Sequence, residues 1–171
     1  MDFSMTRNAK QALDNSVALA KSLNTYQVGT EHLLYGLASV QGSCASKLLA
    51  EQGITEEVLR DYIIKMGNQT YSSRKTMEYT PRVKSIISAA ADVALQVGTP
   101  YIVTEHLLYV LLVDSGSQAV AIIKNLCGNN YITLRHRAYY EITGIKYDPN
   151  IEKGNSYEQE KTRRIRLASK T

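Results

Sequence analysis

The sequence predicts an all-α fold made of two pseudo-symmetric four-helix repeats and a flexible C-terminal tail. Three observations predict it. The string TEHLLY occurs twice, from Thr30 and from Thr104, and the same 74-residue offset aligns further residues on both sides without a gap, which indicates an internal duplication. Apolar residues recur at helical spacing through most of the chain. No apolar–polar alternation lasts long enough to build a β-sheet.

The first helix of each repeat is predicted by a capping threonine followed by an apolar stripe. Thr6 is the expected N-cap in repeat one. Thr80 is the expected N-cap in repeat two, with Pro81 at the first helical position. The stripes consist of Ala9, Leu13, Val17 and Ala20 in the first copy and of Val83, Ile86, Ile87, Ala90, Val93 and Val97 in the second.

The repeated motif predicts the second helix of each repeat, with Thr30 and Thr104 as N-caps. Glycine–serine pairs at 42–43 and 116–117 then break the chain and start short third helices. The motif leucines that we expect to face inward are Leu33, Leu34 and Leu37 in the first copy and Leu107, Leu108 and Leu111 in the second.

The segment GITEEVLRDYIIKM predicts the fourth helix, with Thr55 as its N-cap and two acids in its first turn. Its counterpart, YITLRHRAYYEITG, has a weaker pattern and should end at Gly144. Repeat one thus covers about 3–66, and repeat two covers about 80–144 after a polar loop at 67–79. The expected stripe of the first of these helices contains Val58, Tyr62, Ile63 and Met66.

Residues 1–145 are therefore expected to form the folded domain, and residues 146–171 a polar, basic tail. The tail holds a net charge of +3 of the chain's +4, so the folded body lacks the basic excess that a nucleic-acid surface needs. No apolar run is long enough for a spanning helix, and the N-terminus does not resemble a secretory signal. We expect a cytoplasmic protein without nucleic-acid or membrane partners.

The motif itself has a structural interpretation. Glu31 and Glu105 fall in the first turn of a helix, where exposed amides favour a carboxylate. His32 and His106, beside core leucines, are expected to satisfy backbone carbonyls inside the fold. Adjacent residues on a helix point about 100° apart, so one Glu-His pair rarely supplies two ligands to a metal ion. We therefore expect no metal site.

The chain also lacks the sequence signatures of common enzymes. It contains no His-Glu-x-x-His zinc motif, no Gly-x-Ser-x-Gly nucleophile elbow and no GxxxxGK[ST] phosphate loop. The sequence therefore predicts a binding module without a cofactor, not an enzyme.

The duplicated TEHLL, the TPRVK that opens the second unit, and the glycine-containing turns GSCA and GSQA resemble the double-repeat N-terminal domain of the Clp ATPases, most closely the ClpC type of Gram-positive bacteria. The resemblance covers about residues 3–144. It implies about eight helices in two pseudo-twofold-related halves. It also implies a receptor for protein clients and adaptors of an ATP-dependent unfoldase in a Clp protease, with phosphorylated arginine as one degradation tag.

The resemblance assigns two phosphoarginine pockets. Their carboxylates map onto Glu31 and Glu105, and their helix-capping threonines onto Thr6 and Thr80. Three neighbouring positions depart from the family pattern: Val103 replaces the usual glycine before the second motif, and tyrosine follows TEHLL in both copies, as Tyr35 and Tyr109.

Several alternatives stay open at this point. The chain is either the receptor part of a longer protein, with ATPase modules in cis, or a free-standing homologue that acts as adaptor or decoy and meets such modules in trans. A nucleic-acid role would rest on KTRRIR in the tail alone, and a small enzyme on His32 and His106. The resemblance further implies that the isolated domain is monomeric, because hexamer formation in the family belongs to the ATPase modules.

Overall fold

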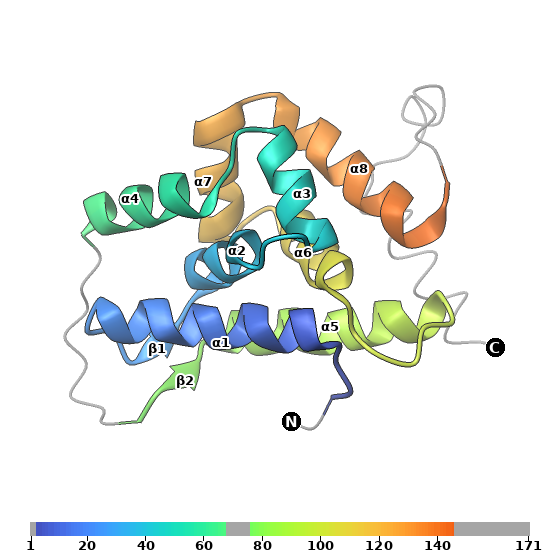
Figure 1. Cartoon of the computed structure of the whole chain (residues 1–171), viewed down its shortest axis with the longest axis horizontal. Coiled ribbons are helices and arrows are strands. Elements are labelled where there is room, and N and C mark those ends of the chain that lie inside the picture. Colours follow the sequence, from blue (N-terminus) through green and yellow to red (C-terminus); the bar gives the residue numbers. More distant parts are fainter. Residues whose placement is uncertain (1–2, 68–75, 146–171) are drawn as a thin grey trace.

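The computed structural model describes residues 3–67 and 76–145 of the 171-residue chain, and Figure 1 shows their arrangement. The described residues contain eight helices in two successive sets of four, so the all-α prediction is confirmed. The predicted tail, KTRRIR included, and most of the predicted linker lie outside the described residues. The helices are α1 (Arg7–Ser22), α2 (Thr30–Ser39), α3 (Cys44–Glu51), α4 (Glu56–Met66), α5 (Pro81–Gln96), α6 (Thr104–Val113), α7 (Gln118–Cys127) and α8 (Asn130–Thr143).

Most of the predicted helix starts are confirmed. The Thr6 hydroxyl oxygen accepts from the amide of Ala9 at 3.3 Å, and the Thr80 hydroxyl oxygen accepts from the amide of Val83 at 3.2 Å. Thr55 caps α4 in the same way. These hydroxyls satisfy amides that have no partner inside their own helix. The third helices begin after capping serines, Ser43 and Ser117, and α8 ends at Gly144 in a left-handed conformation.

The two motif helices form the centre of the molecule. In Figure 1, α1 and α5 lie together along one side, α2 and α6 occupy the middle, and the remaining four helices cover the other side. The predicted inward leucines of both motifs are all fully buried. The duplicated sequence therefore supplies the core, and the starts of α2 and α6 are held between the flanking helices.

Two short strands correct the prediction of a loop through 67–79. Strand β1 (Gln27–Val28) pairs in parallel with β2 (Glu78–Tyr79). A single bridge between Met5 and Ile102 occupies the position that the 74-residue offset predicts for a second copy of this pairing. Strands of two residues have no periodicity that a sequence could reveal.

The stripe predicted for the fourth helix is wrong at Val58 and right elsewhere, because Ile63 is buried and Tyr62 and Met66 pack partly buried against the core. Val58 is 38% exposed, whereas Leu59 and Ile63 face the core. Val97 was likewise assigned to a buried stripe, yet it is 37% exposed because α5 ends there. Ala94 is the last buried residue of that helix.

Helices α1 and α2 approach very closely at Gly36. A Cβ atom added there would lie 2.1 Å from the carbonyl oxygen of Ala12 and 2.2 Å from the hydroxyl oxygen of Ser16. Such distances are far inside van der Waals contact, so only glycine fits between these two helices. The equivalent residue of the second repeat is Val110, so α5 and α6 pack without this restriction.

Within the described residues, no single helix has the length and hydropathy needed to cross a membrane; only α6 and α7 taken together pass that test, and they meet at a bend of 88°.

Candidate functional site

The two motif threonines are not N-caps of their own helices. The N-cap positions are Gly29 for α2 and Val103 for α6, and each threonine is the first helical residue. The hydroxyl oxygen of Thr30 accepts a hydrogen bond from the amide of Ala119 at 3.2 Å. The prediction failed because the threonine hydroxyl caps a helix of the other repeat, α7.

Thr104 makes the symmetry-related contact. Its hydroxyl oxygen accepts from the amide of Ala45, in the first turn of α3, at 3.4 Å. Each motif threonine therefore joins the start of its own helix to the start of the other repeat's third helix. Three helix starts consequently meet near each motif, because the first helix of the other repeat also begins there, as described below.

The motif histidines cap α2 and α6 from within the first turn. Nδ1 of His32 accepts from the amide of Gly29 at 2.9 Å, and Nδ1 of His106 accepts from the amide of Val103 at 3.1 Å. Both histidines are buried, so their predicted internal role is right. Their partner differs, however, because each ring nitrogen accepts from an amide instead of donating to a carbonyl.

Burial is the main influence on both imidazoles, and it lowers the pKa of His32 and of His106 below the usual 6.5. The adjacent carboxylates, Glu31 and Glu105, act in the opposite direction. A neutral imidazole keeps the Nδ1 lone pair that accepts the amide proton. Both the caps and the lowered pKa values therefore favour a neutral imidazole in the folded protein.

The structure pairs Thr80 with the first motif, not with the second. The amide of Glu78 donates to the carbonyl oxygen of Tyr26 at 2.9 Å, and the amide of Thr80 donates to that of Val28 at 3.0 Å. These bonds fix the start of α5 beside the segment that leads into Glu31. Glu31 and Thr80 come from different repeats, and these backbone bonds hold their helix starts next to each other.

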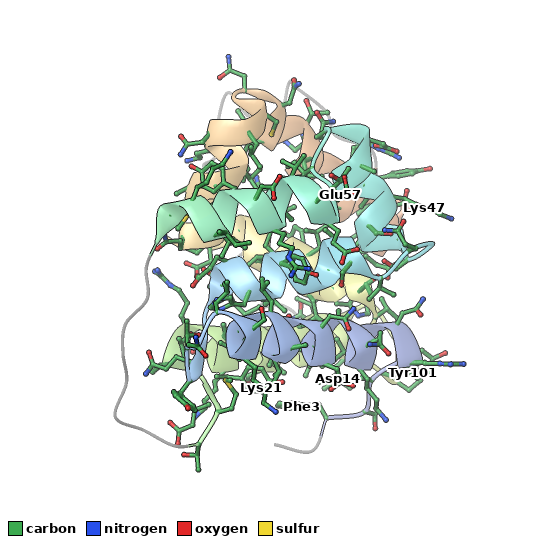
Figure 2. All side chains as sticks on the ribbon, turned by 60° about the vertical axis from the view of Figure 1, so that its left-hand side comes forward. Phe3, Asp14, Lys21, Lys47, Glu57 and Tyr101 are labelled. Carbon is green, nitrogen blue, oxygen red and sulfur yellow. The ribbon has the colours of Figure 1, made fainter. Side chains whose placement is uncertain are left out.

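Thr6 is held beside the second motif by the equivalent contacts. The amide of Ile102 donates to the carbonyl oxygen of Ser4 at 2.9 Å, and the amide of Thr6 donates to that of Ile102 at 3.0 Å. Figure 2 shows the neighbouring Tyr101 close to the start of α1. We call Gly29, Glu31 and Thr80 the Glu31 site, and Val103, Glu105 and Thr6 the Glu105 site.

The two carboxylates are oriented differently. The Glu31 carboxylate lies over Gly29, where an added Cβ would be 2.6 Å from Oε2. Its Oε1 is 3.6 Å from Nδ1 of His32, and the side chain is 21% exposed.

Glu105 instead faces the start of α3. Its Oε1 lies 3.4 Å from the hydroxyl oxygen of Thr104, which in turn contacts the first turn of α3 through the amide of Ala45. Burial, reinforced by the Glu105 charge, raises the pKa of the Cys44 thiol to about 12. This thiol is therefore protonated at neutral pH.

A basic residue near the Glu31 site was not singled out from the sequence, although it lies in the quoted TPRVK. Arg82, in the first turn of α5, pairs with Asp114 at 3.0 Å and donates to the carbonyl oxygen of Gly116 at 2.8 Å. These contacts join the start of α5 to the turn before α7. They help to hold the helix starts of this site together.

The tyrosines that depart from the family pattern contribute to packing. Tyr35 is buried, and its hydroxyl donates to Oε1 of Glu56 in α4 at 2.8 Å. Tyr109 is also buried, with its ring centroid 5.8 Å from that of Tyr139 in α8. Each tyrosine thus fixes the fourth helix of its repeat. Of the three residues that depart from the family pattern, Val103 is the one that belongs to a candidate site.

The chemistry of both sites suits binding. Each has a carboxylate, a threonine hydroxyl and the free amides of a helix start, which together can hold a group that carries both N–H donors and anionic oxygens. Across residues 3–67 and 76–145, His, Cys, Asp and Glu side chains form no group of three or more that could hold a metal ion.

Comparisons with known proteins agree with this architecture. The family model of the Clp repeat (R) N-terminal domain matches residues 4–126 and 78–170. The ATP-binding subunit ClpC of the ATP-dependent Clp protease of Staphylococcus epidermidis is 31% identical over 122 residues, which are 71% of this chain and 15% of that protein. The chain thus spans a small part of the curated relatives that it matches.

Solved structures show the same fold. The N-terminal domain of the chaperone ClpD from Arabidopsis thaliana has a TM-score of 0.68 and 27% identity, over 81% of this chain and 96% of that one. The ClpV N-domain in complex with a VipB peptide has a TM-score of 0.61 and 14% identity, over 82% and 88% of the two chains. At that identity the second likeness concerns the fold alone.

Proposed function

The chain belongs to the Clp repeat N-terminal domain family, and from that premise we propose that it is the substrate- and adaptor-binding domain of a cytoplasmic ClpC-type unfoldase. The family consists of protein-interaction domains and is not catalytic. Its partners would be client and adaptor proteins, together with Clp ATPase modules. Clients marked with phosphorylated arginine would bind at the Glu31 and Glu105 sites.

One observation carries the proposal: hydrogen bonds between the repeats place Thr80 beside the Glu31 helix start and Thr6 beside the Glu105 helix start. Each composite site therefore combines a carboxylate and a hydroxyl with two helix N-termini. A carboxylate can accept hydrogen bonds from the N–H groups of a phosphorylated guanidine. The helix amides and the hydroxyl proton can bind the phosphate oxygens.

The two sites give the duplication a functional meaning. A client that carries two tags, or a flexible client that samples both sites, gains affinity because the second binding event is intramolecular. The complex of the ClpV N-domain with a VipB peptide supports a protein-binding role, since it shows that a domain of this fold can bind a peptide.

A calorimetric titration of the full chain with phosphoarginine tests the proposal, with arginine and phosphoserine as controls. We expect binding of phosphoarginine only. Glu31→Ala should weaken binding at the Glu31 site, and the Glu31→Ala/Glu105→Ala double variant should abolish all binding while circular dichroism shows a folded protein. Absence of phosphoarginine binding by the folded wild-type chain would contradict tag recognition.

We also propose the division of the chain. Residues 1–145 would be the binding domain, with repeats at about 3–66 and 80–144, and residues 146–171 would connect it to ATPase modules. Limited proteolysis followed by mass spectrometry tests this assignment. A stable fragment that ends near 145 is expected, whereas a stable fragment that retains the tail would contradict it.

A further inference from the structure

We propose that the two candidate sites are unequal: the Glu31 site binds phosphoarginine at least tenfold more tightly, and the residue before each motif, Gly29 or Val103, sets the difference. This inference rests on the proposed function for its ligand. It concerns a position at which this chain departs from its own internal repeat.

Backbone conformation does not explain the difference between Gly29 and Val103. Both residues have extended backbones, with φ values of −89° and −108°, which any amino acid adopts. The difference is therefore one of space. An added Cβ at Gly29 would lie 2.6 and 2.8 Å from the two carboxylate oxygens of Glu31.

The carboxylate of Glu31 thus occupies the volume in which the second site has a side chain. Val103 carries a Cβ and two methyl groups at that position, so the Glu105 carboxylate cannot fold back over it in the same way. Glu105 turns toward Thr104, whose hydroxyl oxygen is 3.4 Å from Oε1.

In this orientation Glu105 takes part in contacts that stabilise the folded domain. The hydroxyl of Thr104 donates to Oε1 of Glu105 at 3.4 Å, and the same hydroxyl accepts from the amide of Ala45 in the first turn of α3. A carboxylate at a helix start is stabilised by the exposed amides. A ligand at the Glu105 site would have to replace these interactions before it could use the carboxylate.

The equivalent threonine, Thr30, makes the same contact with the start of α7, but the Glu31 carboxylate lies over Gly29, with Oε1 3.6 Å from Nδ1 of His32. The residue that corresponds to Cys44 is Gln118, which is exposed, and its amide nitrogen lies 4.0 Å from the sulfur of Met66. Local charge does not favour the Glu31 site, because an arginine follows each capping threonine, Arg7 after Thr6 and Arg82 after Thr80, and Arg82 is already paired with Asp114 at 3.0 Å. Access to the carboxylate is therefore the decisive difference.

Reciprocal variants of the full chain test the proposal by calorimetric titration with phosphoarginine. The wild type should show one tight site, which Glu31→Gln removes and Glu105→Gln leaves in place. Val103→Gly should create a second site within about threefold of the first in affinity, whereas Val103→Ala, which keeps the Cβ, should not. Gly29→Ala should weaken the tight site at least tenfold.

The outcomes separate this inference from the proposed function. Two sites of equal affinity in the wild type would overturn the inference and leave tag recognition intact. An unchanged second site in folded Val103→Gly would overturn the role of Val103. Absence of binding in all folded variants would overturn tag recognition, and this inference with it.

Thermal unfolding without ligand gives an independent readout. Because Glu105 interacts with the start of α3, Glu105→Gln should lower the Tm more than Glu31→Gln does. Equal shifts of the Tm would contradict the structural role of Glu105, whatever the titrations show.

Discussion

Thr30 and Ala119 are separated by 89 residues, yet the hydroxyl oxygen of Thr30 accepts a hydrogen bond from the amide of Ala119 at 3.2 Å. Thr104 and Ala45 form the equivalent pair at 3.4 Å. The duplicated threonine thus joins the two repeats twice. These two contacts, buried in the centre of the molecule, give the first of four predictions.

Replacing Thr30 by valine keeps the shape of the side chain and removes the acceptor. We expect the free energy of unfolding to fall by about 1 kcal/mol, the usual cost of losing a helix cap, because the Ala119 amide is left without its partner. Urea denaturation measures this change. Thr30→Ser, which keeps the hydroxyl, is the control, and a valine variant as stable as the wild type would contradict the assigned cap.

Gly36→Ala should destabilise the contact between α1 and α2. The new Cβ would lie 2.1 Å from the carbonyl oxygen of Ala12, so the helices must separate at a cost of about 1–3 kcal/mol. Gly116→Ala is the control, because its Cβ would approach only a guanidinium nitrogen of Arg82, at 3.2 Å. Similar denaturation midpoints for the two variants would rule out a tight helix contact.

The buried histidines should make stability depend on pH. Burial lowers the pKa of His32 and of His106 in the folded state, so below the unfolded value of about 6.5 the unfolded chain binds more protons than the folded chain. Their contribution is therefore complete above about pH 6.5. It declines as the pH falls from 6.5 through the lowered folded-state pKa values.

Thermal unfolding between pH 7.5 and 5.5 measures this decline. In the His32→Gln/His106→Gln variant the Tm should change less over that range, because a glutamine at the third helical position can accept the same amide proton without titrating. An equally steep pH dependence in this variant would assign the effect to other groups.

Cys44 should react slowly with alkylating reagents. With its pKa raised to about 12 by burial and by Glu105, its thiolate is scarce at pH 8, and we expect alkylation by iodoacetamide to be more than about tenfold slower than for an ordinary exposed thiol. Mass spectrometry of the native protein over time follows the reaction.

Glu105→Gln provides the comparison for Cys44, because it removes the negative charge that opposes thiolate formation. The native variant should be alkylated faster at Cys44, and both cysteines should react fully after denaturation. An equal rate at Cys44 in the two native proteins would show that Glu105 does not influence the thiol.

The helix starts that obey local rules were predictable from the sequence. Thr6, Thr55 and Thr80 cap the helices that they precede, because the donor of each cap lies three residues away and is visible in the sequence. Thr30 and Thr104 have the same local appearance. Their donors, however, lie 89 and 59 residues away, so no local rule could distinguish them.

The composition of the candidate sites was also partly predictable. The motif and the family resemblance selected Glu31, Glu105, Thr6 and Thr80, and their role in binding stays a prediction. The sequence did not reveal that each glutamate is grouped with the threonine of the other repeat, because that arrangement depends on backbone hydrogen bonds in segments too short to show a pattern. The same limit applies to the different orientations of Glu31 and Glu105.

The crosswise hydrogen bonds determine what would remain if the polypeptide were divided between its repeats. A fragment with α1–α4 alone would retain Glu31 and Thr6, which belong to different sites. Two separate fragments would have to reassociate before either candidate site formed. The chain is thus comparable to a covalently linked dimer, and deletion of one repeat would eliminate both candidate sites instead of only one.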